Sequence, residues 1–100
     1  MEISIQEHSP QVISIETLSE ITGVHPDFVS ELEHAQLIQR IGTDPKGSPA
    51  FEDTVVCEVR RIVHLHEREK MSFRMIRYLF RLTRRLERVE SELRSYRERY

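Results

Sequence analysis

A regular apolar seam at the C-terminal end of the chain constrains its fold more than any other feature. Its members alternate in steps of three and four residues: Leu79, Leu82, Leu86, Val89, Leu93, Tyr96 and Tyr100. That spacing is the a/d pattern of a coiled coil, with Arg and Glu at most positions between. One continuous helix over residues 79–100 would be about 33 Å long. The rest of the chain is too short to cover such a stripe, so the seam predicts a partner helix, most simply in a homodimer.

Local signals upstream of the seam predict a helix-turn-helix. Ser14 is placed to cap a helix whose apolar residues recur at helical spacing, and Gly23 ends that helix. Pro26 suits the first position of a second helix, where its missing N–H would have no partner anyway. Val29 and Leu32 form the apolar stripe of this second helix. A tight turn at residues 24–25 therefore joins two short amphipathic helices.

A β-hairpin wing is expected next. Leu37, Ile38 and Ile41 predict a strand, and Ala50-Phe51 predict a returning strand. Residues 42–49 between them contain two Gly and two Pro, which is typical of a loop.

The fold class expected from these signals is mainly α, with a winged helix-turn-helix core, a small hairpin wing and a long C-terminal coiled-coil helix. Helical spacing resumes at about residue 53, a charged break covers residues 67–70, and Ser72 caps the helix that follows. We assign residues 1–11 to an N-terminal arm, residues 12–78 to the core and residues 79–100 to the dimerisation helix. At 38% hydrophobic residues, the core is small and benefits from a partner subunit.

The two halves of the chain carry opposite charge. Residues 1–53 hold ten acidic and two basic residues, whereas residues 54–100 hold thirteen basic and seven acidic ones. The total of −2 therefore hides halves of −8 and +6. Charge distribution of this kind sets partner choice more than the total does.

Residues 13–80 resemble the MerR-type winged-helix domain. The similarity is carried by I-S-I-E-T-L-S-E-I-T-G-V at the front, F-E-D-T-V-V opening the third helix and M-S-F-R-M-I-R-Y-L before the seam. The resemblance implies an antiparallel coiled-coil dimer. Typical members continue with G-V-S-x-x-T-L-R-Y-Y-D-E-x-G-L-L, and their R-Y-Y contacts DNA phosphates. Here that R-Y-Y falls on Ser30, Glu31 and Leu32, an upstream arginine falls on Asp27, and the usual Gly falls on Gln36. The residues that contact DNA phosphates in typical members are therefore absent here or replaced by residues of opposite charge.

With these changes in its second helix, the chain resembles the chaperone-modulator protein CbpM family. That family keeps the MerR-like core and coiled coil but has an acidic second helix. The resemblance implies binding to the J domain of a DnaJ-like co-chaperone of the CbpA type. Such binding blocks engagement of the DnaK chaperone and restrains DNA binding by CbpA. The J-domain surface that meets DnaK is typically basic, so we expect contacts from Asp27, Phe28, Glu31 and His34. The alternative is structural: Asp27 favours the helix dipole, Glu31 is solvated and Phe28 belongs to the core.

A DNA-binding regulator of the MerR family is the alternative function. It would use Arg60 and Arg61, or Lys46 in the wing, in place of the usual phosphate contacts. We interpret the arginines of residues 81–99 as a solvated coiled-coil face, because glutamates are interleaved with them. A third interpretation is a plain dimerisation module, but this would leave the role of the core unexplained.

Nothing in the sequence predicts catalysis, a cofactor or a metal site. His64 and His66 lie two residues apart, so a helix would point them to different faces. Cys57, the single cysteine, lies in an apolar helical stretch and is expected to be buried. We find no signal peptide and no apolar run long enough to span a membrane, and we expect a cytoplasmic protein.

Overall fold

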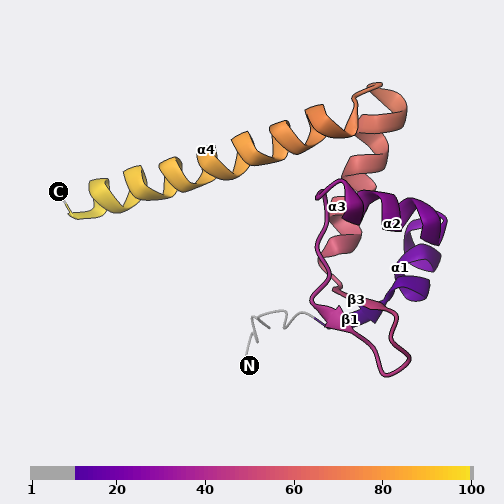
Figure 1. Cartoon of the computed structure of the whole chain (residues 1–100). Helices are drawn as coiled ribbons and strands as arrows, with labels where there is room; N and C mark the ends of the chain where they lie inside the picture. The colour runs from indigo at the N-terminus through magenta and orange to yellow at the C-terminus, as the bar shows by residue number, and fades with distance from the viewer. Residues whose placement is uncertain (1–10, 100) are drawn as a thin grey trace, which may run out of the picture.

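The computed structural model describes residues 11–99, in which a small three-stranded sheet and a group of short helices carry one long projecting helix (Figure 1). The elements are β1 (Val12–Ser14), α1 (Ile15–Thr22), α2 (Pro26–His34), β2 (Gly42–Thr43), β3 (Pro49–Glu52), α3 (Val55–Val63), the π-helix η1 (His64–Arg68) and α4 (Phe73–Arg99). The expected mainly α, winged helix-turn-helix architecture is confirmed. Residues 1–10 of the expected N-terminal arm, and Tyr100 of the seam, lie outside the described residues.

The turn between α1 and α2 follows from local caps. The Ser14 hydroxyl accepts a hydrogen bond from the Thr17 N–H at 3.1 Å and so caps α1. Gly23 ends α1 at a φ of 75°, and its N–H donates to the Ser19 carbonyl at 2.8 Å. Pro26 opens α2, and the His25 Nδ1 atom accepts from the Asp27 N–H at 3.0 Å. The predicted start and stop of α1 and the predicted start of α2 are therefore confirmed.

Helix α2 ends in a Schellman motif built without glycine. Gln36 has a φ of 62°, and its N–H donates to the Glu33 carbonyl at 3.0 Å. The Leu37 N–H donates to the Leu32 carbonyl at 2.9 Å, which completes the motif. Leu32 and Leu37 are both buried in the core, as the hydrophobic contact of this motif requires.

The prediction of a strand that begins at Leu37 is wrong. Leu37 and Ile38 lie in an irregular connection, and β2 comprises only Gly42–Thr43. Consecutive strand residues point to opposite faces, but Leu37 and Ile38 are both buried, at 4% and 5% exposure. An irregular backbone lets both side chains enter the core.

The wing is a β-hairpin within an antiparallel sheet of order β1-β3-β2. Ile13 pairs with Phe51, and Gly42 pairs with Ala50. The Asp44 carboxylate holds the loop by accepting hydrogen bonds from the N–H groups of Lys46 and Ser48, each at 2.9 Å. The expected hairpin and its returning strand are confirmed, although its first strand is shorter than predicted.

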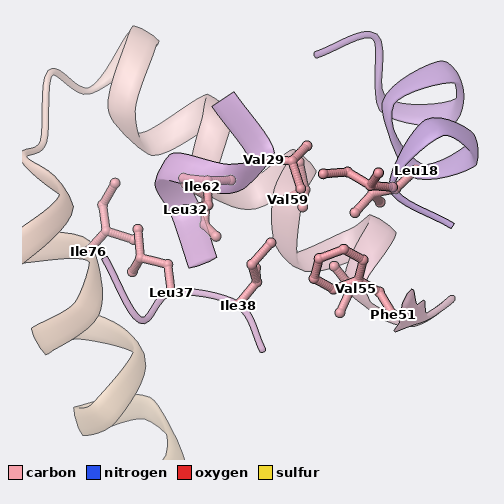
Figure 2. Close-up of a cluster of buried hydrophobic side chains, with 11 residues drawn as sticks. Leu18, Val29, Leu32, Leu37, Ile38, Phe51, Val55, Val59, Ile62 and Ile76 are labelled. Atoms are coloured by element: carbon pink, nitrogen blue, oxygen red, sulfur yellow. The ribbon is translucent and has the colours of Figure 1, made fainter. Parts of the chain in front are cut away.

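The hydrophobic core lies between α2, α3 and β3, with α1 on one side and the start of α4 on the other (Figure 2). Its fully buried side chains are Leu18, Val29, Leu32, Phe51, Val59, Ile62 and Ile76. Cys57 is exposed, which corrects the expectation that it is buried. It lies two residues from both Val55 and Val59, about 200° around α3 from the residues that enter the core.

Helix α4 leaves the core after its second turn, in which Phe80 still packs against the core. The helical backbone of α3 continues through η1 to Arg68, so the break falls at residues 69–72, slightly later than the charged segment predicted. Lys70 there has a φ of 57°, and the Ser72 hydroxyl caps α4 by accepting from the Met75 N–H at 3.1 Å. The radius of gyration is 16.7 Å, against about 13 Å for a compact domain of this length. Most of α4 is therefore an arm that the core does not cover (Figure 1).

Candidate functional site

The exposed face of α2 is acidic. Asp27, Ser30, Glu31 and His34 are all exposed and follow the i, i+3, i+4, i+7 spacing of one helix face. The opposite face, with Val29 and Leu32, is fully buried. In a helix-turn-helix protein that binds DNA, the exposed face of the second helix enters the major groove. Here that face presents two carboxylates and no Lys or Arg.

This face forms one side of a shallow hollow of about 510 Å³. Asp27, Ser30, Glu31, His34 and Ala35 line it from α2, and Phe73 lines it from the start of α4. Three of the four expected contact residues therefore lie together. The hollow combines carboxylates with an aromatic ring, so it presents both charge and apolar surface to a partner. Phe73 was missed by the sequence reasoning, because its position beside α2 depends on the turn between α3 and α4.

Phe28, the fourth expected contact residue, packs inside the fold. Its ring is partly buried and meets the ring of Phe73 edge-on at a centroid distance of 5.9 Å. His66 lies against Phe73 at 4.4 Å, and its Nδ1 donates to the Met71 carbonyl at 2.8 Å. This aromatic cluster of Phe28, His66 and Phe73 fixes the start of α4 against α2. This packing agrees with the alternative in which Phe28 belongs to the core and does not contact a partner.

Glu33, a further acid of α2, is engaged within the chain. Both of its carboxylate oxygens accept hydrogen bonds from Arg40, one of them from Nη2 at 2.7 Å and the other from Nε. The hydrogen bond from Arg40 lowers the pKa of the Glu33 carboxyl below its ordinary value. Glu33 is therefore paired, in contrast to Glu31 on the hollow. The sequence did not predict this pair because its members are seven residues apart across an irregular turn.

Arg60 and Arg61 do not form one basic surface. Arg60 donates to the carbonyl of Ile21 at the end of α1, at 3.3 Å. The guanidinium of Arg61 lies over the ring of Phe80 in α4, at 6.0 Å from its centroid. The two arginines thus contact different elements, and Lys46 is exposed on the wing loop.

The seam of α4 is exposed over its described length. The exposed fractions are 38% for Leu79, 42% for Leu82, 58% for Leu86, 56% for Val89, 49% for Leu93 and 61% for Tyr96. Met75, at 55%, lies four residues before Leu79 and extends the seam toward the core. Its spacing was visible in the sequence but was not assigned to the seam. A continuous apolar stripe of this length is typical of an interaction surface.

Residues 11–99 contain neither a metal site nor a membrane-spanning helix. No group of three or more His, Cys, Asp or Glu side chains is arranged to hold a metal ion within that range. Among the helices of the same residues, none is both long and apolar enough to cross a bilayer.

The helix-turn-helix, the hairpin wing and the two helices that follow define a winged helix-turn-helix protein. The family model described as MerR HTH family regulatory protein matches residues 13–98. The chain therefore belongs to the MerR helix-turn-helix family. No curated protein gives a significant match.

Proposed function

We propose that this protein is a protein-binding adaptor of the CbpM type, whose MerR-like core binds the J domain of a CbpA- or DnaJ-like co-chaperone. The observation that carries the proposal is the acidic exposed face of α2, on the helix that reads DNA in related folds. DNA-binding proteins gain affinity by neutralising phosphates with Lys and Arg. Asp27 and Glu31 would repel phosphates at that place.

The same face complements a basic partner. The J-domain surface that engages DnaK is typically basic along its second helix, and opposite charges favour docking and fix its orientation. Asp27 and Glu31 lie one helical turn apart, so two cations of a facing helix can meet them together. His34 and Phe73 line the rest of the hollow and supply polar and apolar contact area.

Inhibition would follow from competition. An α2 face that occupies the basic J-domain surface excludes DnaK from it, and this mechanism requires no catalysis, metal or cofactor. The exposed seam of α4 supports a homodimer, which would present two such faces. A partner of this kind would place the protein in the cytoplasm.

A DNA-binding transcriptional regulator is the second candidate, and membership of a family of regulatory proteins favours it. Such a regulator would bind DNA through Lys46 of the wing and the arginines of the C-terminal half. Its affinity would fall steeply with salt, because each neutralised phosphate releases counterions.

A charge-reversal pair tests the proposed face. Titration of an isolated CbpA-type J domain into Asp27→Lys/Glu31→Lys at low salt is expected to show at least tenfold weaker binding than the wild type. The matched control is Glu16→Lys/Glu20→Lys, which makes the same charge change on exposed positions of α1. Equal binding by the wild type and the α2 variant would refute the assignment, since screening is weakest at low salt.

A further inference from the structure

A groove rich in arginine lies between α4 and the connection that follows α2. Five arginines of α4 line it: Arg77, Arg81, Arg84, Arg85 and Arg88. Gln36, Leu37 and Phe80 supply the rest of the lining, and the groove encloses about 460 Å³. We call it the arginine groove. The groove is lined from α4, which projects away from the core (Figure 1), and from the connection that follows α2.

The arginine groove is separate from the seam. Arg77 and Arg81 each lie two residues from Leu79, and Arg84 and Arg88 each lie two residues from Leu86. Two residues correspond to about 200° around a helix, so these arginines point away from the seam. A partner helix that covers the seam would therefore leave these four arginines uncovered, whereas Arg85, next to Leu86, flanks the seam.

The positive charge of the groove is not neutralised within the described chain. Within residues 11–99, the carboxylates of Glu33, Asp27 and Glu69 lie within 4 Å of Arg40, His25 and His64, respectively, and no carboxylate lies that close to the five groove arginines. Residues 73–88 hold six arginines and one acid, Glu87. Arginines four residues apart, such as Arg77 and Arg81, destabilise a helix by repulsion. An anionic partner would remove this repulsion.

The surroundings of the groove favour an acidic polypeptide over a nucleic acid. Beyond Gln36, Leu37 and Arg84 the surface continues into a second hollow of about 870 Å³, which is lined by Glu52 and Glu58 and by the paired Glu33 and Arg40, among others. A nucleic acid carries negative charge along its whole length, so Glu52 and Glu58 would repel it. A polypeptide can place carboxylates against the arginines and neutral or basic side chains against the glutamates.

We propose that the arginine groove binds an acidic polypeptide segment. Guanidinium groups bind carboxylates through paired, directional hydrogen bonds, and the ring of Phe80 provides an apolar contact between them. This site differs from the α2 face in its charge and its location. One chain would thus bind a basic partner at α2 and an acidic one at α4.

Fluorescence anisotropy with a labelled Glu-Glu-Leu repeat peptide tests this proposal on the full chain. We expect binding that weakens with salt, and no binding of the matching Gln-Gln-Leu peptide. Arg81→Gln/Arg84→Gln should lower the affinity at least fivefold. The control Arg94→Gln/Arg97→Gln removes the same charge farther along α4 and should change it less than twofold. Glutamine is a good helix former, and circular dichroism with sedimentation would verify that both variants keep their helix and assembly state.

Three results would overturn the proposal. The first is no binding of the acidic peptide at low salt. The second is an equal loss of affinity in both double variants, which would show attraction to overall charge and no defined groove. The third is tighter binding of a single-stranded or duplex oligonucleotide than of the acidic peptide. If only Arg81→Gln/Arg84→Gln then lost affinity for the oligonucleotide, the groove would be a nucleic-acid site.

Discussion

Replacing Gln36 by glycine should stabilise the protein. Gln36 ends α2 in the left-handed region, at a φ of 62°, where a side chain with a Cβ is strained. That conformation costs a non-glycine residue about 1–2 kcal/mol, and glycine avoids this cost. Glycine gains more freedom in the unfolded chain, which cancels about 0.5–1 kcal/mol of the benefit. The side chain of Gln36 is exposed, so its removal forfeits little packing. The net expectation for Gln36→Gly is a gain of about 0.5–1 kcal/mol.

Urea denaturation followed by circular dichroism would measure this gain. For a domain of this size, such a gain raises the melting temperature by about 2–8 °C. The protein concentration must be the same for all variants, because self-association adds to apparent stability.

Gln39→Gly is the matched control. Gln39 is exposed in the same connection, but it is not among the residues with positive φ. Glycine there only loosens the unfolded chain and should cost about 0.4–1 kcal/mol. If Gln36→Gly were no more stable than the wild type, the strain assigned to the end of α2 would be wrong.

Three further predictions concern the seam, the core and acid stability. Leu86→Glu places a charge in the middle of the exposed seam and should convert a dimer to a monomer in sedimentation equilibrium; a wild-type protein that is already monomeric would contradict the interpretation of the seam. Leu32→Ala removes a fully buried side chain and should cost about 2–5 kcal/mol in urea unfolding, and a loss below about 1 kcal/mol would show that the core is not formed as described. Arg40→Gln should destabilise the protein at neutral pH, because Arg40 lowers the pKa of Glu33 from its ordinary value of 4.5. Since the folded-state pKa of Glu33 is the lower one, this contribution is complete above about pH 4.5 and is lost as the pH falls through the folded-state pKa. The difference in stability between wild type and Arg40→Gln should therefore vanish in acid, and a difference independent of pH would exclude this cause.

The parts of the fold that the sequence predicted are those that depend on interactions between neighbouring residues. Ser14, Gly23 and Pro26 each act through their own backbone neighbours, so the sequence predicted the bounds of α1 and the start of α2. Leu37 and Ile38 were misassigned because a short apolar run does not distinguish a strand from an irregular segment that enters the core. The strained φ of Gln36 was indicated only by comparison with the glycine that the MerR family usually has there.

Long-range packing explains what the sequence did not predict. The cluster of Phe28, His66 and Phe73 joins residues from α2, η1 and α4, and no local pattern connects them. Cys57 was judged by its apolar neighbours, although its helical position relative to Val55 indicates the exposed face. The arginine groove had a visible signal in the four-three-four spacing of Arg77, Arg81, Arg84 and Arg88, but that spacing was interpreted as a solvated face. Only the position of α4 beside Leu37 turns the stripe into a groove.

Calorimetric titration of this protein with an isolated CbpA-type J domain, beside a fluorescence-anisotropy titration with random duplex DNA, tests the central claim most directly. Both titrations would be made at low and at moderate salt. The acidic face of α2 predicts saturable binding of the J domain and no binding of the duplex. Tight DNA binding that falls steeply with salt, together with no heat from the J domain, would contradict the adaptor function and favour the regulator.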